Sequence, residues 1–243
     1  MRDLLLLAGT AEARALAAEF AGIPEVRPLA SFAGVTADPA AFSIPTRSGG
    51  FGGVEGLAAF LRTLEQPILI DATHPFAKQM QLNAAEGAAL TVTPRLRVLR
   101  PPWPTRPSWI AVPDLRAAAD ALPGGARVLL TTGRKEIAPF AARADLDCTL
   151  RTIEPVPGLP PHITPVIERP PYRLAAETRL LGQGFTHLVT KNAGGTGTAK
   201  LDAAEALRLT TIVVSRPPPP PVPIAQTVSE AVAWLRQIVA NGT

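Results

Sequence analysis

The sequence contains a single cysteine, Cys148, and three histidines, at positions 74, 162 and 187. A lone cysteine excludes an internal disulfide, although it does not identify a compartment. The histidines are widely separated along the chain, so we do not expect a site in which histidine and cysteine bind a metal ion. The chemistry of this protein should therefore depend on neither a disulfide nor a bound metal.

Long apolar runs are also missing. The run near the start, Leu4–Ala8, is much shorter than the roughly 20 residues needed to cross a bilayer, and Glu12 and Arg14 follow it closely. We therefore expect no signal peptide, no membrane contact and a cytoplasmic location. Aromatic residues make up only 5% and no run of lysine and arginine occurs, so nucleic-acid binding is not expected. The net charge of +4 fits a GC-rich genome, and a small polyanionic ligand would explain it equally well.

What is present is an alternation of short apolar runs, typical of buried parallel strands, with alanine-rich segments typical of helices. The 243 residues, 47% of them hydrophobic, suffice for one large domain or two small ones. The expected strands are 4–8, 26–31, 68–71, 96–99, 109–112, 127–131, 147–153, 186–190 and 211–215. The expected helices are 11–21, 54–64, 75–90, 115–122, 173–182, 199–209 and a last one capped by Thr227 with Glu230.

Residues 101–108 carry four prolines and suggest a domain boundary. Each half then contains a strand that ends in a turn of glycine and threonine. We predict an α/β fold of two Rossmann-like parallel-sheet domains, residues 1–104 and 105–243, which face a central cleft. The proline run 217–221 is expected to cross the surface in an extended conformation.

The first strand is followed by Gly9-Thr10-Ala11-Glu12, where a Rossmann fold holds a pyrophosphate on a helix N-terminus. The motif is not Gly-x-Gly-x-x-Gly, so an ordinary tight turn with a threonine cap explains it equally well. Ser31 lies 22 residues after Gly9, where NAD enzymes commonly have Asp or Glu. Without a carboxylate there, a 2′-phosphate is not repelled, and Arg47 or Arg27 is expected to help bind it. A dinucleotide site would therefore favour NADP, although Ser31 would serve equally well as the start of a loop.

Two further motifs follow in the first half. The segment Arg47-Ser48-Gly49-Gly50-Phe51-Gly52-Gly53 permits close backbone approach and suits a loop over a cofactor, with a flexible connector as the alternative. The segment Asp71-Ala72-Thr73-His74-Pro75-Phe76-Ala77 follows a strand at the edge where parallel sheets bind ligands. We favour positioning roles for Asp71, as the cap of a turn, and for His74, through a hydrogen bond to the loop backbone.

In the second half, Thr131-Thr132-Gly133-Arg134-Lys135 follows a strand and is expected to open a helix. Cations are unfavourable at a helix N-terminus, which indicates carboxylates of a ligand rather than a solvated helix start. Residues 187–202 run from a strand into a loop with three glycines, three threonines and two lysines. This loop lacks the Walker order but suits an anion. Lys200 is a stronger candidate than Lys191 because it opens the following helix.

Together and in this order, these motifs resemble those of precorrin-6A reductases, a family of NADPH-dependent enzymes of cobalamin biosynthesis. The resemblance is carried by Gly9–Arg14, Arg47–Gly53, Asp71–Ala77, Thr131–Lys135, Thr190–Leu201 and Val214–Pro217. The first turn departs from the family by reading Ala-Gly-Thr instead of Gly-Gly-Thr. The resemblance implies hydride transfer from NADPH to an unsaturated carbon of a tetrapyrrole macrocycle that carries many carboxylates, with the active site between two α/β domains.

On this basis we predict a site in each domain. The residues assigned to NADPH are Gly9, Thr10, Glu12, Ser31, Arg47, Gly49, Gly50, Phe51, Gly52, Thr73 and His74. The residues assigned to the macrocycle are Thr132, Gly133, Arg134, Lys135, Lys191, Asn192, Gly194, Gly195 and Thr196. Lys200 is assigned to catalysis, where it would polarise the ring.

Three alternatives stay open. A dehydrogenase of a smaller carbonyl compound lacks the expected Tyr-x-x-x-Lys pair, because Tyr172 is the only tyrosine. A reductase of the cobalt-containing analogue would use the same motifs. A non-catalytic NADP(H) sensor would not need a second anionic site. Other enzymes of the corrin pathway are the protein partners that the resemblance leaves open.

Overall fold

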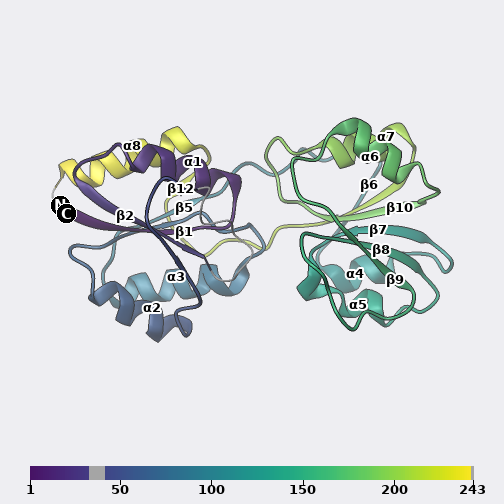
Figure 1. The fold of residues 1–243 in the computed structure, drawn as a ribbon, viewed down its shortest axis with the longest axis horizontal. Helices are drawn as coiled ribbons and strands as arrows, with labels where there is room; N and C mark the ends of the chain where they lie inside the picture. The colour runs from purple at the N-terminus through teal and green to yellow at the C-terminus, as the bar shows by residue number, and fades with distance from the viewer. Residues whose placement is uncertain (33–41, 242–243) are drawn as a thin grey trace. The chain divides into compact units, whose positions relative to one another are not determined.

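The computed structural model describes residues 1–32 and 42–241, and the chain divides into two units. Unit 1 comprises residues 1–101 and 217–243, and unit 2 comprises residues 102–216. Each unit is built on its own six-stranded sheet, and the pairs in both sheets are parallel (Figure 1). The expected break near 104 lies close to the observed one. The expectation that 105–243 forms one domain is wrong for its last segment, which returns to unit 1.

The described residues of unit 1 form ten helices and strands. They are β1 (Arg2–Leu7), α1 (Ala11–Phe20), β2 (Val26–Phe32), β3 (Thr46–Ser48), α2 (Gly53–Arg62), β4 (Ile68–Asp71), α3 (Lys78–Leu90), β5 (Arg95–Val98), β12 (Ile224–Ala225) and α8 (Val228–Ala240). The strands lie in the order β12-β5-β4-β1-β2-β3. Helices α1 and α8 cover one face of the sheet, and α2 and α3 cover the other (Figure 1).

The core of unit 1 follows from the alternation of side chains along its strands. In β1, Leu4 and Leu6 pack with the residues of α1 and α8, whereas Leu5 and Leu7 pack against α2 and α3. All four leucines are buried because helices cover both faces. This double burial is the reason why β1 is a continuous apolar run instead of an alternating pattern.

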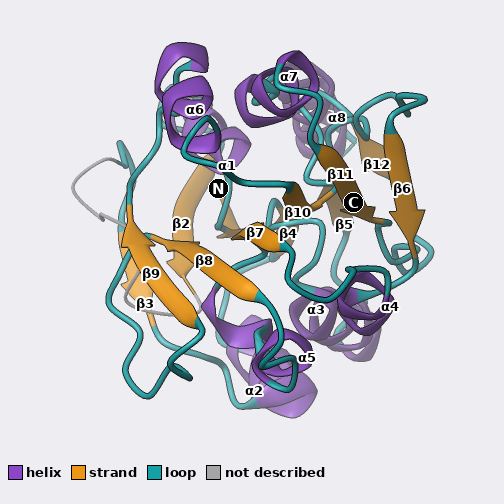
Figure 2. Ribbon diagram, turned by 90° about the vertical axis from the view of Figure 1, so that its right-hand side faces the viewer, coloured by secondary structure: helices purple, strands orange, loops and turns teal. Residues whose placement is uncertain are grey.

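Unit 2 repeats this plan with helices on both faces of its sheet (Figure 2). Its elements are β6 (Trp109–Val112), α4 (Leu115–Asp120), β7 (Arg127–Thr131), a 3₁₀ turn (Arg134–Glu136), α5 (Ala138–Ala141), β8 (Asp147–Thr152), β9 (Ile163–Ile167), α6 (Leu174–Leu181), β10 (His187–Lys191), α7 (Ala199–Ala206) and β11 (Thr210–Val214). The strands lie in the order β6-β11-β10-β7-β8-β9. In the described part of the chain, no helix has both the length and the apolar character needed to cross a membrane.

Both sheets have the strand arrangement of a Rossmann fold, but each places its sixth strand unusually in the sequence. In unit 1 the sixth strand is β12, which comes after all of unit 2. In unit 2 the corresponding strand is β6, which precedes the other five. The chain therefore passes between the units twice, once at each of the two proline-rich segments recognised in the sequence.

Several elements differ from the expectation. The helix expected from residue 75 begins at Lys78, and the helix expected after Thr132 is a 3₁₀ turn followed by the short α5, which has Pro139 in its first turn. The strands β3, β9 and β12 were not predicted. They lie at sheet edges, where one side of the strand is unpaired and a continuous apolar run is not required. The cap of α8 is confirmed, because the Thr227 hydroxyl accepts a hydrogen bond from the Glu230 N–H.

Candidate functional site

In both units the predicted motifs gather at the carboxyl edge of the sheet, where the strand order reverses. In unit 1 this reversal lies between β1 and β4, and in unit 2 it lies between β7 and β10. Open α/β sheets bind ligands at such positions, because the loops that leave the two neighbouring strands diverge there. The loop after β1 begins at Ala8 and the loop after β4 at Ala72.

The turn after β1 is tied to the turn after β4. The Thr10 hydroxyl caps α1 by accepting from the Ala13 N–H at 3.2 Å, and it donates to the Ala72 carbonyl at 2.8 Å. A Cβ at Gly9 would lie 3.6 Å from the Thr73 Cα, so this turn lies against the second loop. The first-turn motif is therefore a capped helix N-terminus that faces a ligand edge.

Glu12, which we had assigned to the cofactor, has a structural partner. Its carboxylate pairs with the Arg100 guanidinium at 2.5 Å, and both side chains are largely buried. This pair balances a negative charge at the start of α1. An anion at the helix N-terminus would otherwise be repelled by Glu12.

The end of β2 and the glycine loop form a second cluster. Arg47 lies on β3, next to Ser31 in the register, and donates to the Ser31 hydroxyl at 2.8 Å and to the Gly49 carbonyl at 3.2 Å. Its guanidinium lies 4.1 Å from the centre of the Phe51 ring. No carboxylate among the described residues forms an ion pair with Arg47. Among the described residues, the cluster therefore offers a hydroxyl and a cation that no carboxylate pairs with, which is the chemistry that a 2′-phosphate requires.

Arg27, our alternative to Arg47, is excluded from this cluster. It lies near the start of β2, at the amino edge of the sheet, and pairs with Asp3 and Glu65 at 2.7 Å each. Arg27 and Ser31 lie near opposite ends of β2, so they cannot reach the same ligand group.

A small cavity of about 20 Å³ joins three of the motifs in unit 1. Its lining residues are Leu7, Ala8, Ser31, Gly49, Gly50, Phe51, Thr73 and Met80. Five of these eight were assigned to the cofactor from the sequence. Met80, on α3, was not assigned, because a single methionine in a helical segment carries no functional signal.

Asp71 and His74 make hydrogen bonds within the loop after β4, which is the kind of contact expected of them. The Asp71 carboxylate accepts hydrogen bonds from the Thr73 N–H at 3.0 Å and the Thr73 hydroxyl at 2.7 Å. The His74 Nδ1 accepts from the Phe76 N–H at 3.3 Å. These bonds fix the conformation of the loop after β4.

The sequence reasoning missed Arg97, which completes this network. Its guanidinium contacts Asp71 at 2.6 Å and donates to the Thr73 hydroxyl and carbonyl at 2.9 and 3.0 Å. Only 2% of Arg97 and 1% of Asp71 are exposed. Burial lowers the pKa of Arg97, and the charge of Asp71 opposes that shift. A charged residue within the apolar run of β5 was the available signal.

In unit 2, the loop after β10 is held by Trp103 and Arg216, which lie next to the two points where the chain passes between the units. The Trp103 N–H donates to the Asn192 side-chain oxygen at 2.9 Å, and the Trp103 indole donates to the Gly195 carbonyl at 3.0 Å. Arg216 donates to the Asn192 and Ala193 carbonyls at 2.7 and 2.8 Å. Gly194 and Gly195 have φ of +66° and +74°, which favours glycine. Asn192, Gly194 and Gly195 therefore give the loop its shape, while Thr196 is exposed.

The cations of unit 2 differ in their surroundings. Lys200 lies in the first turn of α7, and its ammonium is 5.0 Å from the centre of the Trp103 ring. Arg134 is exposed and pairs with Glu154 at 2.7 Å. Because Arg134 lies in a 3₁₀ turn, our argument from an unfavourable helix N-terminus does not apply to it. The side chain of Lys135 lies outside the described residues.

Lys191 is the most buried of these cations. It ends β10, is 9% exposed, and its ammonium contacts the Glu136 carboxylate. Burial lowers the pKa of the Lys191 ammonium to about 8. Thr132 follows the last residue of β7 that pairs with β10, and its hydroxyl is buried without a hydrogen-bond partner among the described residues.

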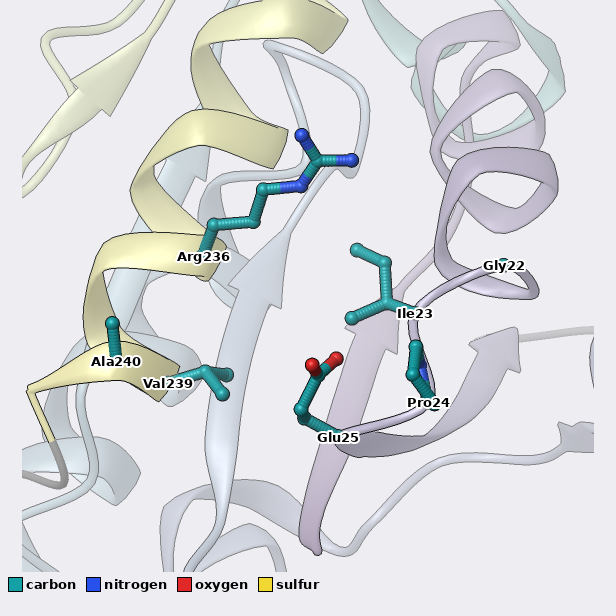
Figure 3. Close-up of a pocket in the computed structure, with 7 residues that line it drawn as sticks. All are labelled: Gly22, Ile23, Pro24, Glu25, Arg236, Val239 and Ala240. Atoms are coloured by element: carbon teal, nitrogen blue, oxygen red, sulfur yellow. The ribbon is translucent and has the colours of Figure 1, made fainter.

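A larger pocket lies elsewhere, at the amino edge of unit 1 (Figure 3). It measures about 480 Å³ and lies between the turn Gly22–Glu25 and the end of α8, at Arg236, Val239 and Ala240. None of the residues in the predicted motifs lines it. The carboxyl edges of the two sheets, and not this pocket, are therefore the candidate sites.

Comparisons with known proteins show which family this sequence and fold resemble. The sequence model of the family described as "Precorrin-6x reductase CbiJ/CobK" matches residues 3–236. The chain is 42% identical to a precorrin-6A reductase of Rhodococcus erythropolis, over 97% of this chain and 98% of that protein. It is 29% identical to a cobalt-precorrin-6A reductase of Priestia megaterium, over 88% and 90% of the two chains. A solved structure described as "CobK precorrin-6A reductase" superposes with a TM-score of 0.89 at 41% identity, covering 98% of this chain and 97% of that one.

Proposed function

The chain belongs to the precorrin-6x reductase CbiJ/CobK family, and from that premise we propose how its residues carry out the reaction. It is a precorrin-6A reductase, an oxidoreductase of cobalamin biosynthesis that reduces a C=C bond of a tetrapyrrole macrocycle with NADPH. The proposal divides the two ligands between the carboxyl edges of units 1 and 2. We also propose that the protein is located in the cytoplasm and that it meets other enzymes of the corrin pathway there.

Unit 1 holds the coenzyme. The N-terminus of α1, capped by Thr10, offers backbone N–H groups to the pyrophosphate. Asp71 and Arg97 hold Thr73 and His74 in place on the loop that faces this turn. The bound coenzyme supplies the hydride, and the chain contributes position and charge.

The Ser31–Arg47 cluster is the observation that supports NADPH as the coenzyme. A 2′-phosphate would take hydrogen bonds from the Ser31 hydroxyl and the Arg47 guanidinium, which already lie 2.8 Å apart. The Arg47 guanidinium lies over the Phe51 ring, which supports it. The glycines at positions 49, 50 and 52 let the loop backbone approach a ligand closely.

Unit 2 holds the macrocycle through its carboxylates. The proposed contacts are the hydroxyl of Thr132, the backbone at Gly133, the guanidinium of Arg134 and the exposed Thr196, with Lys135 on the same turn. Asn192, Gly194 and Gly195 keep the loop open for these contacts. Lys200 approaches the ring with its ammonium and polarises it, and full turnover with full substrate affinity in Lys200→Ala would exclude that role.

The substrate is proposed to be the metal-free macrocycle. The relatives at 42% or 43% identity over nearly the whole chain are named precorrin-6A reductases. Those named for the cobalt-containing compound are 28–30% identical. Turnover of the two macrocycles by one preparation, compared as kcat/KM, tests the choice.

The first experiment is anaerobic oxidation of NADPH by the purified protein after addition of precorrin-6A, with NADH as the control. We expect turnover with NADPH and little with NADH. NADPH binding without turnover of either macrocycle would instead identify a sensor.

The same assay tests the coenzyme site. Arg47→Met removes a charge-assisted hydrogen bond worth about 1.5–3 kcal/mol, so the preference for NADPH over NADH should fall about 10- to 100-fold. Arg27→Met is the matched control, because Arg27 lies at the other end of β2 and should leave the preference unchanged. An unchanged preference in Arg47→Met would contradict the assignment.

A further inference from the structure

The proposed function leaves the proton of the reduction without a source, and the buried end of β10 offers one. Leu188 of β10 packs with α6 and α7, so by alternation Lys191 points to the face that carries α4 and α5. The 3₁₀ turn on that face brings Glu136 into contact with the Lys191 ammonium. Lys191 is thereby held at the point where the strand order of unit 2 reverses.

The two partners of this pair differ sharply in their access to solvent. The Lys191 side chain is 11% exposed and the Glu136 side chain is 52% exposed. The ammonium is therefore shielded from bulk water, while the carboxylate that touches it is half in solvent. Glu136 is therefore the member of the pair that bulk water reaches.

The other charged groups at this edge have partners of their own. Arg134 pairs with Glu154, Arg216 donates to the Asn192 and Ala193 carbonyls, Lys200 lies over Trp103, and Asp202 pairs with Arg106. Glu136 contacts the Lys191 ammonium, and the buried Thr132 hydroxyl at the end of the neighbouring β7 has no hydrogen-bond partner among the described residues.

We propose that Lys191 donates the proton of the reduction and that Glu136 is a positioning residue that returns a proton to it. The inference rests on the proposed function. Hydride from NADPH adds to one carbon of the C=C bond, and the electron pair of that bond moves onto the ring. The neighbouring carbon takes a proton from the Lys191 ammonium. The neutral amine then takes a proton from water through Glu136, so NADPH and one solvent proton are consumed for each bond reduced.

The test is the pH dependence of kcat with NADPH and precorrin-6A. A proton donor must be protonated, so kcat of the unaltered enzyme should fall as the pH rises through about 8, the pKa of Lys191. Lys191→Met should lose about 100-fold or more in kcat, with little change in the KM of the macrocycle. Lys191→Ala should regain turnover when methylamine is added. Glu136→Gln should move the alkaline fall to lower pH, because its carboxylate no longer favours the ammonium.

Each result bears on the inference. A raised KM with unchanged kcat in Lys191→Met would mean that Lys191 binds a substrate carboxylate, and the inference would be wrong. An alkaline fall that Glu136→Gln leaves in place would also overturn it. Glu136 is exposed enough to replace without unfolding, so this variant decides the matter if the Lys191 variants do not fold. Lack of turnover by the unaltered enzyme would contradict the proposed function itself.

Discussion

Gly56, in the first turns of α2, is the position where one added methyl group should disturb the glycine-rich loop 47–53 most directly. A Cβ built at Gly56 would lie 2.6 Å from the carbonyl carbon of Phe51 and would overlap its oxygen. Real Cβ atoms essentially never approach other atoms within 3.0 Å, and the neighbour here is backbone instead of a flexible side chain. Gly56→Ala must therefore push Phe51 away from α2.

For Gly56→Ala, the expected change in the free energy of unfolding has the opposite sign to that of most glycine-to-alanine replacements in helices. Replacing glycine by alanine inside a helix ordinarily raises the free energy of unfolding by about 0.5–1 kcal/mol. Overpacking costs about 1–3 kcal/mol, so Gly56→Ala should lower it. Phe51 also supports Arg47, with 4.1 Å between guanidinium and ring centre, and lines the small cavity of unit 1. NADPH affinity should fall about tenfold or more, because small displacements of a binding group are costly.

Urea unfolding and a fluorescence titration with NADPH measure the two effects. Glu55→Gln is the matched control, since it changes an exposed side chain on the same helical turn and adds no atom toward Phe51. If Gly56→Ala is as stable as the unaltered protein and binds NADPH equally well, the close contact between α2 and the loop does not exist in solution.

Two other predictions follow from contacts in unit 1. Arg97→Met leaves the Asp71 carboxylate buried without its cation, so the free energy of unfolding should fall by about 3–5 kcal/mol in urea titrations. Arg95→Met, on the same strand, is the control and should cost less than about 1.5 kcal/mol; equal losses would refute the buried pair. Deletion of residues 217–243 removes β12 and α8, so calorimetry should show that unit 1 melts at a lower temperature while unit 2 keeps its transition. If the chain without residues 217–243 bound NADPH with full affinity, unit 1 would not depend on β12 and α8.

The sequence was sufficient to predict the two-sheet α/β architecture because its central strands are buried on both faces. Runs such as Leu4–Ala8 and Arg127–Thr131 have a composition that suits few other structures. The edge strand β9 escaped prediction, since Pro165 interrupts it and much of it is exposed. The return of α8 to unit 1 could not be predicted either, because amphipathic patterns do not say which sheet a helix covers.

The candidate site shows the same division. Ser31 and Arg47 could be identified because a missing carboxylate and a glycine-rich loop are local features. Arg97, Trp103 and Arg216 were missed, because each acts on a loop that is distant in the sequence. Local motifs predicted which segments lie at the carboxyl edges of the two sheets, whereas the residues that hold those segments in place depend on packing between strands.

The late position of β12 and α8 in the chain reverses the usual order in which a nascent protein acquires its domains. Domains ordinarily complete from the N-terminus as the ribosome releases them. Here every strand of unit 2 has been synthesised before residues 217–243, so the middle of the chain can finish folding first. Until then β5 is an open edge and the face of unit 1 that α8 covers is bare, a state prone to aggregation. Translation that stops before residue 217 would therefore release a chain with a complete unit 2 and an incomplete unit 1.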